Sequence, residues 1–192
     1  QLKKDVGVAI KKITPAMFDK LRKDPNYATY PNILAGIVSV SMLQEDYAKA
    51  DVYVKRIRDE FPWAVKSMRD VAEIVSRVDI IRITGFKNED DLPMLMKAPE
   101  ALSTAPELYD NRLKYIAALY FEQRHERAIE EGLKLIRAEP KLLPELKKSG
   151  YLPAEASLNS GNSTPARKVV FLIFDALGNE NELVIRARKK MA

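Results

Sequence analysis

A spacing that occurs twice constrains the fold of this chain more than any other feature of the sequence. In each copy a ring side chain stands three residues before an alanine, and the alanine stands twelve residues before a proline. Because proline lacks a backbone donor and clashes with the preceding turn, each proline predicts the end of a helix. Two such units indicate a helical repeat, in which stacked helical pairs offer a continuous surface to a partner. The copies are Tyr47, Ala50 and Pro62, and His125, Ala128 and Pro140.

The remaining segments also have the length and pattern of helices. Prolines divide the chain and almost no stretch alternates with period two, so the sequence predicts an all-α fold. Residues 33–43 and 47–60 predict the first helical hairpin. Residues 63–84 are expected to form one longer helix that ends at Gly85. Residues 91–97 are expected to form a short helix that pairs with it, and the two make a degenerate middle repeat.

The second clear hairpin begins at Thr104, where a capping threonine, a proline at the first helical position and a glutamate three residues later agree. Its first helix runs to Tyr120, and its second runs from His125 to Pro140. Gly132 lies inside that second helix, where glycine costs about 1 kcal/mol relative to alanine. We therefore expect another helix to approach closely at Gly132.

The last part of the chain predicts a loop and two more helices. Residues 141–164 contain prolines and a polar run, and are expected to form a flexible loop insert. Pro165 starts the next helix and Gly178 closes it. Asn179 and Glu182 are expected to cap the final helix, whose basic end suits the negative end of the helix dipole.

The composition limits the classes of function that the chain can have. A chain of 192 residues with 46% apolar and 31% charged side chains is expected to form a single domain over residues 1–192. No apolar run approaches the roughly 18 to 20 residues that a membrane span needs, so we expect no membrane partner. The chain has no cysteine, which excludes disulfides, thiol nucleophiles and thiolate zinc sites. The net charge of +5 is mild and lies mostly near the two ends, which argues against nucleic acid.

No catalytic, cofactor or metal site is indicated, and we expect the chain not to be an enzyme. His125 is the only histidine, and there is no glycine-rich phosphate loop. Residues 89–91 are acidic but lack the glycine and the alternation of a calcium loop. Glu130 and Glu131 are adjacent on a predicted helix and so point in different directions, which argues against a paired acid–base site.

Two segments resemble tetratricopeptide units. Residues 109–140 resemble one unit through His125, Ala128 and Pro140, and residues 31–62 resemble a second. Both lack the tryptophan and the glycine of the first helix of that family's pattern. The resemblance implies an all-α, tetratricopeptide-like fold in which antiparallel helical hairpins stack as a short solenoid.

The end of the chain resembles a narrower group. In order and spacing it is similar to the terminal segment of thioredoxins that carry a C-terminal tetratricopeptide-like domain, the CnoX or YbbN type co-chaperones of bacteria, with relatives in some protozoan mitochondria. The matching residues are Ala166, Arg167, Lys168, Phe174, Leu177, Gly178, Leu183, Val184 and Arg188 to Met191. This resemblance implies a thioredoxin domain upstream in the full protein, and a location in the mitochondrial matrix or the bacterial cytoplasm. It also implies a chaperone role, in which the domain binds unfolded client proteins or a partner chaperone.

In tetratricopeptide hairpins the first helix lines the concave face, so the resemblance also implies candidate binding residues. Most of them are apolar, and a flexible thioether beside flat rings suits an extended hydrophobic peptide. The alternative is that the same residues pack in the core between repeats. The candidate protein-binding residues are Asn32, Ala35, Met42, Leu43, Leu113, Tyr120 and Phe121.

A mitochondrial RNA-binding or complex-assembly scaffold is the alternative function. Basic and aromatic side chains interleave at Arg112, Lys114, Tyr115 and Arg124, a pattern that can stack single-stranded RNA. Helical-repeat RNA binders place short polar residues at one fixed position in each repeat, and no such column is visible here. Binding to unfolded clients or a partner chaperone is therefore the first hypothesis.

Overall fold

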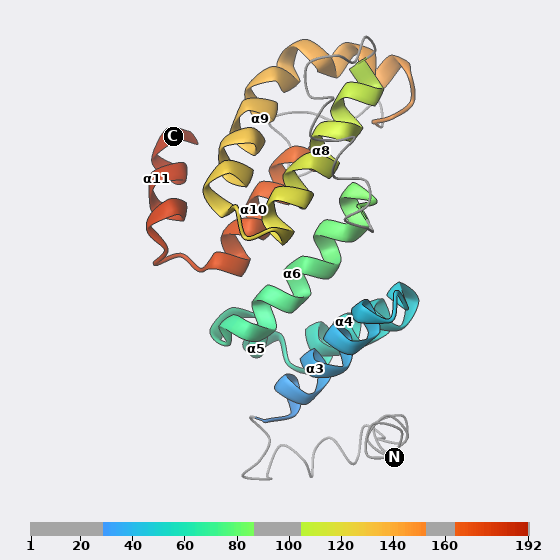
Figure 1. Ribbon diagram of the computed structural model, residues 1–192, viewed down its shortest axis with the longest axis vertical. Coiled ribbons are helices and arrows are strands. Elements are labelled where there is room, and N and C mark those ends of the chain that lie inside the picture. The colour runs from blue at the N-terminus through green and yellow to red at the C-terminus, as the bar shows by residue number, and fades with distance from the viewer. Residues whose placement is uncertain (1–28, 87–104, 153–163, 192) are drawn as a thin grey trace.

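The computed structural model describes residues 29–86, 105–152 and 164–191. All regular structure in these ranges is α-helical, which confirms the all-α helical-repeat fold. Figure 1 shows the helices arranged along the long axis of the molecule, with α3 towards one end and the C-terminal part of α9 at the other. The helices of the described ranges are α3 (Tyr30–Leu43), α4 (Tyr47–Glu60), α5 (Pro62–Ser67), α6 (Arg69–Thr84), α8 (Ala105–Phe121), α9 (His125–Lys148), α10 (Pro165–Leu177) and α11 (Glu182–Met191).

The two predicted hairpins, α3–α4 and α8–α9, have the same turn. Glu45 and Gln123 occupy the same repeat position, and both adopt a positive φ, at 56° and 61°. Ala50 and Ala128 are both fully buried, because a small side chain lets the paired helices approach. The backbone bonds also correspond. Gln44 N, Glu45 N and Asp46 N donate to Val40 O, Met42 O and Ser41 O at 3.1, 3.0 and 2.9 Å; Glu122 N, Gln123 N and Arg124 N donate to Ala118 O, Tyr120 O and Leu119 O at 2.9, 3.0 and 2.9 Å.

The two prolines of the repeated spacing behave differently. In the first unit α4 ends at Glu60, Phe61 leaves the helical region (φ −132°, ψ 51°), and Pro62 begins α5. In the second unit the prediction of a helix end at Pro140 was wrong, because α9 continues through Pro140 and Pro144 to Lys148.

Packing explains why α9 tolerates two internal prolines. Leu135, Glu139 and Leu146 lie fully buried along it, and this burial offsets the two backbone donors that the prolines lack. The helix bends in its C-terminal part, as expected where prolines interrupt the hydrogen-bond ladder (Figure 1). The predicted loop over residues 141–164 is therefore helical in its first part; residues 153–163 lie outside the described ranges, as do residues 89–91 and 91–97.

Two smaller predictions need correction. The single helix expected over residues 63–84 is broken at Met68, whose extended backbone (φ −111°, ψ 107°) separates α5 from α6. The end of α6 at Gly85, in the left-handed region with φ 66°, was predicted correctly. At the start of α11 the side chain of Asn181, not Asn179, accepts a hydrogen bond from Leu183 N at 2.9 Å.

Two hydrophobic cores share α6. The N-terminal core combines α3, α4 and α5 with Val71, Val75 and Val78 of α6. The C-terminal core combines α8 to α11 with Ile80 and Phe86. Along its length α6 packs most extensively against α10, which comes much later in the chain, and this non-local pair holds the two halves together.

Gly132 marks a close approach between α9 and α10. It is buried in α9, and a Cβ added to it would overlap Cγ2 of the fully buried Val170 on α10. The expected close approach at Gly132 is therefore confirmed.

Candidate protein-interaction surfaces

The candidate residues on α8 are not available to a partner. Leu113 and Tyr120 are buried, at 0% and 3% exposure. Phe121 is half-buried; its ring stacks on Phe86 with centroids 5.8 Å apart, and the guanidinium of Arg77 lies 5.1 Å from its centroid. Leu113 and Tyr120 therefore belong to the core between repeats, the alternative that the sequence left open, because α6 and α10 pack against this helix.

The candidate residues on α3 divide into two groups. Ala35 is buried and Met42 is half-buried against the N-terminal core, so the groove prediction was wrong for Ala35. Asn32 is exposed, and Leu43 is 85% exposed. The structure therefore leaves only part of the predicted set on the surface, and that part lies on one helix.

α3 has an unusual outer surface for an exposed helix. None of its 14 residues is charged. Its buried residues follow helical spacing and face the N-terminal core, and the opposite side is open and mostly apolar. We call this open side the α3 face; it consists of Asn32, Ile33, Gly36, Ser39, Val40 and Leu43.

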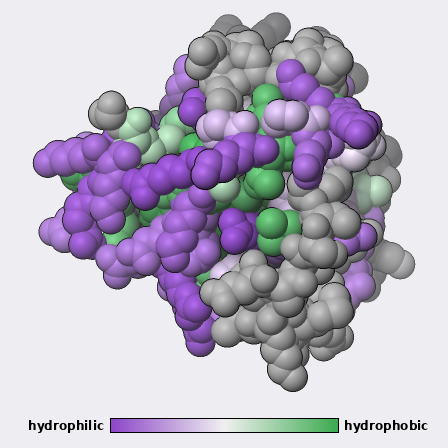
Figure 2. All heavy atoms as spheres, turned by 90° about the horizontal axis from the view of Figure 1, so that it is seen from above, coloured by the Kyte–Doolittle hydropathy of each residue, from purple (hydrophilic) through white to green (hydrophobic). Residues whose placement is uncertain are grey.

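The opposite end of the molecule is different in character. Figure 2 looks down on the end formed by the C-terminal part of α9, and there hydrophilic side chains cover most of the described surface, with hydrophobic ones visible only in small areas between them. The end seen in Figure 2 therefore differs from the α3 face, where no side chain is charged. Exposed apolar surface of this kind marks interaction sites.

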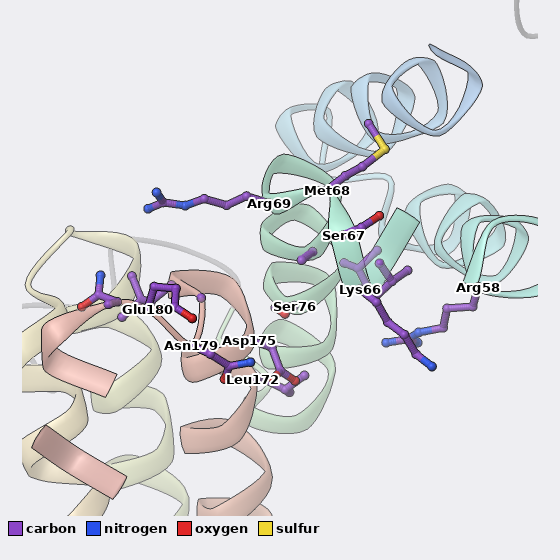
Figure 3. Close-up of a pocket in the computed structure, with 16 residues that line it drawn as sticks. Arg58, Lys66, Ser67, Met68, Arg69, Ser76, Leu172, Asp175, Asn179 and Glu180 are labelled. Atoms are coloured by element: carbon purple, nitrogen blue, oxygen red, sulfur yellow. The ribbon is translucent and has the colours of Figure 1, made fainter. Parts of the chain in front are cut away.

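A cleft of about 690 Å³ lies between the start of α6 and the end of α10. Its volume falls within the roughly 300 to 1,000 Å³ usual for ligand sites. Figure 3 shows the lining side chains, which come from α4, α5, α6, α10 and the turn before α11. Its apolar lining residues include Val65, Ala72, Val75, Leu172 and Leu177.

The cleft carries opposite charges on opposite walls. Arg58 of α4 and Lys66 of α5 stand on one wall, while Asp175 of α10 and Glu180 of the following turn stand on the other (Figure 3). Partial burial raises the pKa of Asp175, and the positive charge of Arg188 opposes this shift. Within the described residues neither Lys66 nor Asp175 forms an ion pair.

Comparison with known proteins identifies the repeat. A family model described as tetratricopeptide repeat matches residues 88–192, which is more than half of the chain. The chain belongs to the tetratricopeptide repeat family. Comparisons with curated proteins and with solved structures gave no match.

Membership of the tetratricopeptide repeat family makes this chain a protein-interaction module in general, because such domains mediate contacts between proteins. Tetratricopeptide domains are typically non-catalytic scaffolds. The matched residues include α8 to α11; α3 and α4 lie outside the match but repeat the turn of α8–α9. In the described ranges, none of the helices combines the length and the apolar character that crossing a membrane requires.

The tetratricopeptide domain also contains a buried polar cluster. Tyr109 donates a hydrogen bond to Oε1 of the fully buried Glu139 at 2.6 Å and accepts one from Ala166 N at 3.1 Å. Burial raises the pKa of Glu139, although the nearby hydroxyl of Thr164, the hydrogen bond from Tyr109 and the charge of Arg167 act in the other direction. This cluster ties α8 and α9 to the start of α10, so its role is structural.

The pattern that suggested RNA is not arranged for stacking. Tyr115 is 4% exposed. Lys114 pairs with Asp110 at 2.8 Å, and Arg124 pairs with Glu122 at 3.4 Å. The ring that would stack on a base is therefore inside the core. Among the described residues no group of three or more histidine or acidic side chains could hold a metal ion.

Proposed function

We propose that this tetratricopeptide domain holds unfolded client segments against the α3 face, as the client-binding part of a thioredoxin-type co-chaperone. The observation that carries the proposal is the α3 face itself. Leu43 is 85% exposed and Ile33 is 41% exposed on a helix without a single charge. An unfolded segment offers apolar side chains in no fixed order, and a broad apolar side that lacks specific polar partners suits such a ligand.

The resemblance of the chain's end supports the co-chaperone context. The segment that resembles thioredoxin-type co-chaperones, residues 166–191, forms α10 and α11, and its apolar residues Phe174 and Val184 are fully buried. We propose a thioredoxin domain ahead of this domain in the full protein, and a location in the mitochondrial matrix or the bacterial cytoplasm. The matching residues would then preserve the scaffold, while the clients meet α3.

The mechanism is shielding without chemistry. A client segment buries its apolar side chains against Ile33, Val40 and Leu43, and each contact of this kind contributes roughly 25 cal/mol per Å² of apolar area removed from water. Individual contacts are weak, so affinity comes from their sum along the segment and clients can leave again.

Suppression of thermal aggregation of an unrelated heat-labile enzyme, followed by light scattering, tests the proposal. We expect Leu43→Asp and Ile33→Asp to reduce suppression several-fold, because a carboxylate on the α3 face must be desolvated when a client covers it. The matched control is Val52→Asp, the same kind of change at a 59% exposed apolar residue of α4 outside the α3 face. All three variants should keep the helical circular dichroism of the unmodified domain.

Two results would refute the proposal. One is an equal loss of suppression in all three variants, which would indicate general charge effects. The other is unchanged aggregation together with binding of single-stranded RNA that weakens steeply with salt, which would favour the RNA-binding scaffold.

A further inference from the structure

We propose that the cleft between α5–α6 and the end of α10 is a second binding site, which takes an extended peptide carrying an acidic and a basic side chain on neighbouring residues. α3 contributes no residue to this cleft, so the site is separate from the α3 face. The peptide proposed for this cleft differs from an unfolded apolar client, because the cleft recognises it through its charged side chains.

The cleft occupies a junction in the fold. It lies where the N-terminal and C-terminal cores meet, and its lining comes from both halves of the chain. Ligand sites occur preferentially at such junctions. Apart from Met68 and the turn of residues 178–181 before α11, the lining belongs to helices, and the packing of α6 on α10 fixes the position of Asp175.

One wall of the cleft carries basic side chains. Arg58 is held in place by Asp79, a carboxylate that is 4% exposed, which also accepts a hydrogen bond from Arg82 at 2.7 Å. Lys66 stands beside Arg58 on the same wall and has no ion pair within the described residues (Figure 3). This wall therefore offers a positive charge for a ligand carboxylate.

The facing wall offers a negative charge. Asp175 projects from α10 into the cleft, and Glu180 lies on the turn that follows α10 (Figure 3). Across the cleft Lys66 and Asp175 do not pair with each other, although opposite charges attract. Arg69 points away from Lys66 in the same view, and its charge acts on His125 instead. Lys66 and Asp175 thus stand on opposite walls, and neither forms an ion pair within the described residues.

An extended peptide can contact both walls of the cleft. Successive side chains of an extended peptide point to opposite sides. In a peptide that lies along the cleft, the side chains of two adjacent residues therefore point to opposite walls. The side chains of two residues that are separated by a third point to the same wall. Apolar lining residues such as Val75 and Leu172 add a preference for flanking aliphatic residues. Phosphate backbones do not fit this arrangement, because Asp175 and Glu180 repel them.

Two capped peptides of identical composition test the inference. The first, Gly-Leu-Glu-Lys-Leu-Gly, has adjacent charges; the second, Gly-Glu-Leu-Lys-Leu-Gly, has charges two residues apart. Backbone amide shifts of Ser67, Ser76 and Gly178 report binding at the cleft, because these residues line it. We expect the first peptide to move these signals and to bind about fivefold tighter than the second, the upper range for a partly exposed charge pair.

Reversing the charge of Lys66 tests the inference through a gain of binding. Lys66→Glu should weaken the first peptide about fivefold and improve binding of Gly-Leu-Lys-Lys-Leu-Gly, because each wall then offers a carboxylate without an ion pair to a lysine of the peptide. Lys168→Glu, which makes the same change on an exposed residue of α10 outside the cleft, should leave both peptides unaffected. Leu43→Asp on the α3 face should also leave them unaffected, which separates this site from the proposed client surface.

Any of four results overturns the inference: equal affinity for the two peptides of identical composition, no binding of either, no effect of Lys66→Glu on the first peptide, or signal changes away from the cleft. Stronger movement of the cleft signals by a single-stranded RNA oligonucleotide at physiological salt would also overturn it. The thermal unfolding of each variant, measured in parallel, confirms that the compared proteins are folded.

Discussion

Gly132→Ala tests the packing of α9 on α10 with a single methyl group. Glycine inside a helix normally costs stability, and replacing it with alanine should recover about 1 kcal/mol. At Gly132 the new Cβ would overlap Cγ2 of Val170, a side chain with no exposed surface. Valine is stiff about χ1 in a helix, so Val170 cannot turn away without strain.

The two effects can be weighed against each other. Overpacking a well-filled core costs typically 1 to 3 kcal/mol, against the gain of about 1 kcal/mol in helix propensity. We therefore expect Gly132→Ala to lower the free energy of unfolding by up to about 2 kcal/mol. Gly36→Ala is the matched control, because Gly36 is also inside a helix but a Cβ there meets nothing within 4 Å. It should raise the free energy of unfolding by about 1 kcal/mol.

Urea unfolding followed by circular dichroism at the helical band measures both changes. Both substitutions restrict the unfolded chain in the same way, so the difference between them reports the native state. A third variant, Val170→Ala, removes the methyl group that the new Cβ would meet. In that background Gly132→Ala should become stabilising, with a coupling energy of about 1 to 3 kcal/mol.

The reasoning fails if Gly132→Ala stabilises the domain as much as Gly36→Ala does. That outcome would mean that α9 and α10 are not in close contact at this glycine. An unchanged effect of Gly132→Ala in the Val170→Ala background would lead to the same conclusion.

Two further substitutions probe buried charges. Because burial raises the folded-state pKa of Glu139 above its ordinary value, its contribution to stability is fully present below that ordinary value and is lost as the pH rises through the raised one. The free energy of unfolding of the unmodified domain should therefore fall relative to that of Glu139→Gln as the pH is raised from 4 to 8; a constant difference in urea titrations would contradict this. Asp79→Asn should lower the free energy of unfolding by roughly 1 to 3 kcal/mol, because it removes the charge that binds Arg58 and Arg82. The control Arg82→Gln, at a more exposed partner, should cost under about 1 kcal/mol, and an equal cost would contradict the buried role of Asp79.

Local features of the fold could be predicted from the sequence. The spacing around Ala50 and Ala128 predicted two hairpins, and their turns share a positive φ and corresponding backbone hydrogen bonds. The end of α6 at Gly85 and the start of α10 at Pro165 were also predicted. These signals act within a few residues, through caps, backbone freedom and turn geometry, so the sequence shows them directly.

Features that depend on distant packing could not be predicted in this way. Pro140 and Pro144 carry a local signal to end a helix, and the burial of Glu139 and Leu146 overrides it. The packing of α6 on α10 joins segments far apart in the chain, and neither helix carries a local mark of its partner. The cleft was missed for the same reason, since its lining comes from several helices that the sequence does not place together.

The candidate binding residues show why a repeat alone does not locate a binding surface. Leu43 and Phe121 occupy the same position in the two hairpins, directly before the shared turn. Leu43 is 85% exposed, whereas Phe121 stacks on Phe86 beneath the guanidinium of Arg77. The repeat rule assigns both residues to one face, but α6 covers that face on α8, and no described helix covers the corresponding side of α3. The availability of a repeated position therefore depends on which helices pack against its unit, and an uncharged helix side that no described helix covers, as on α3, is a surface that a partner can reach.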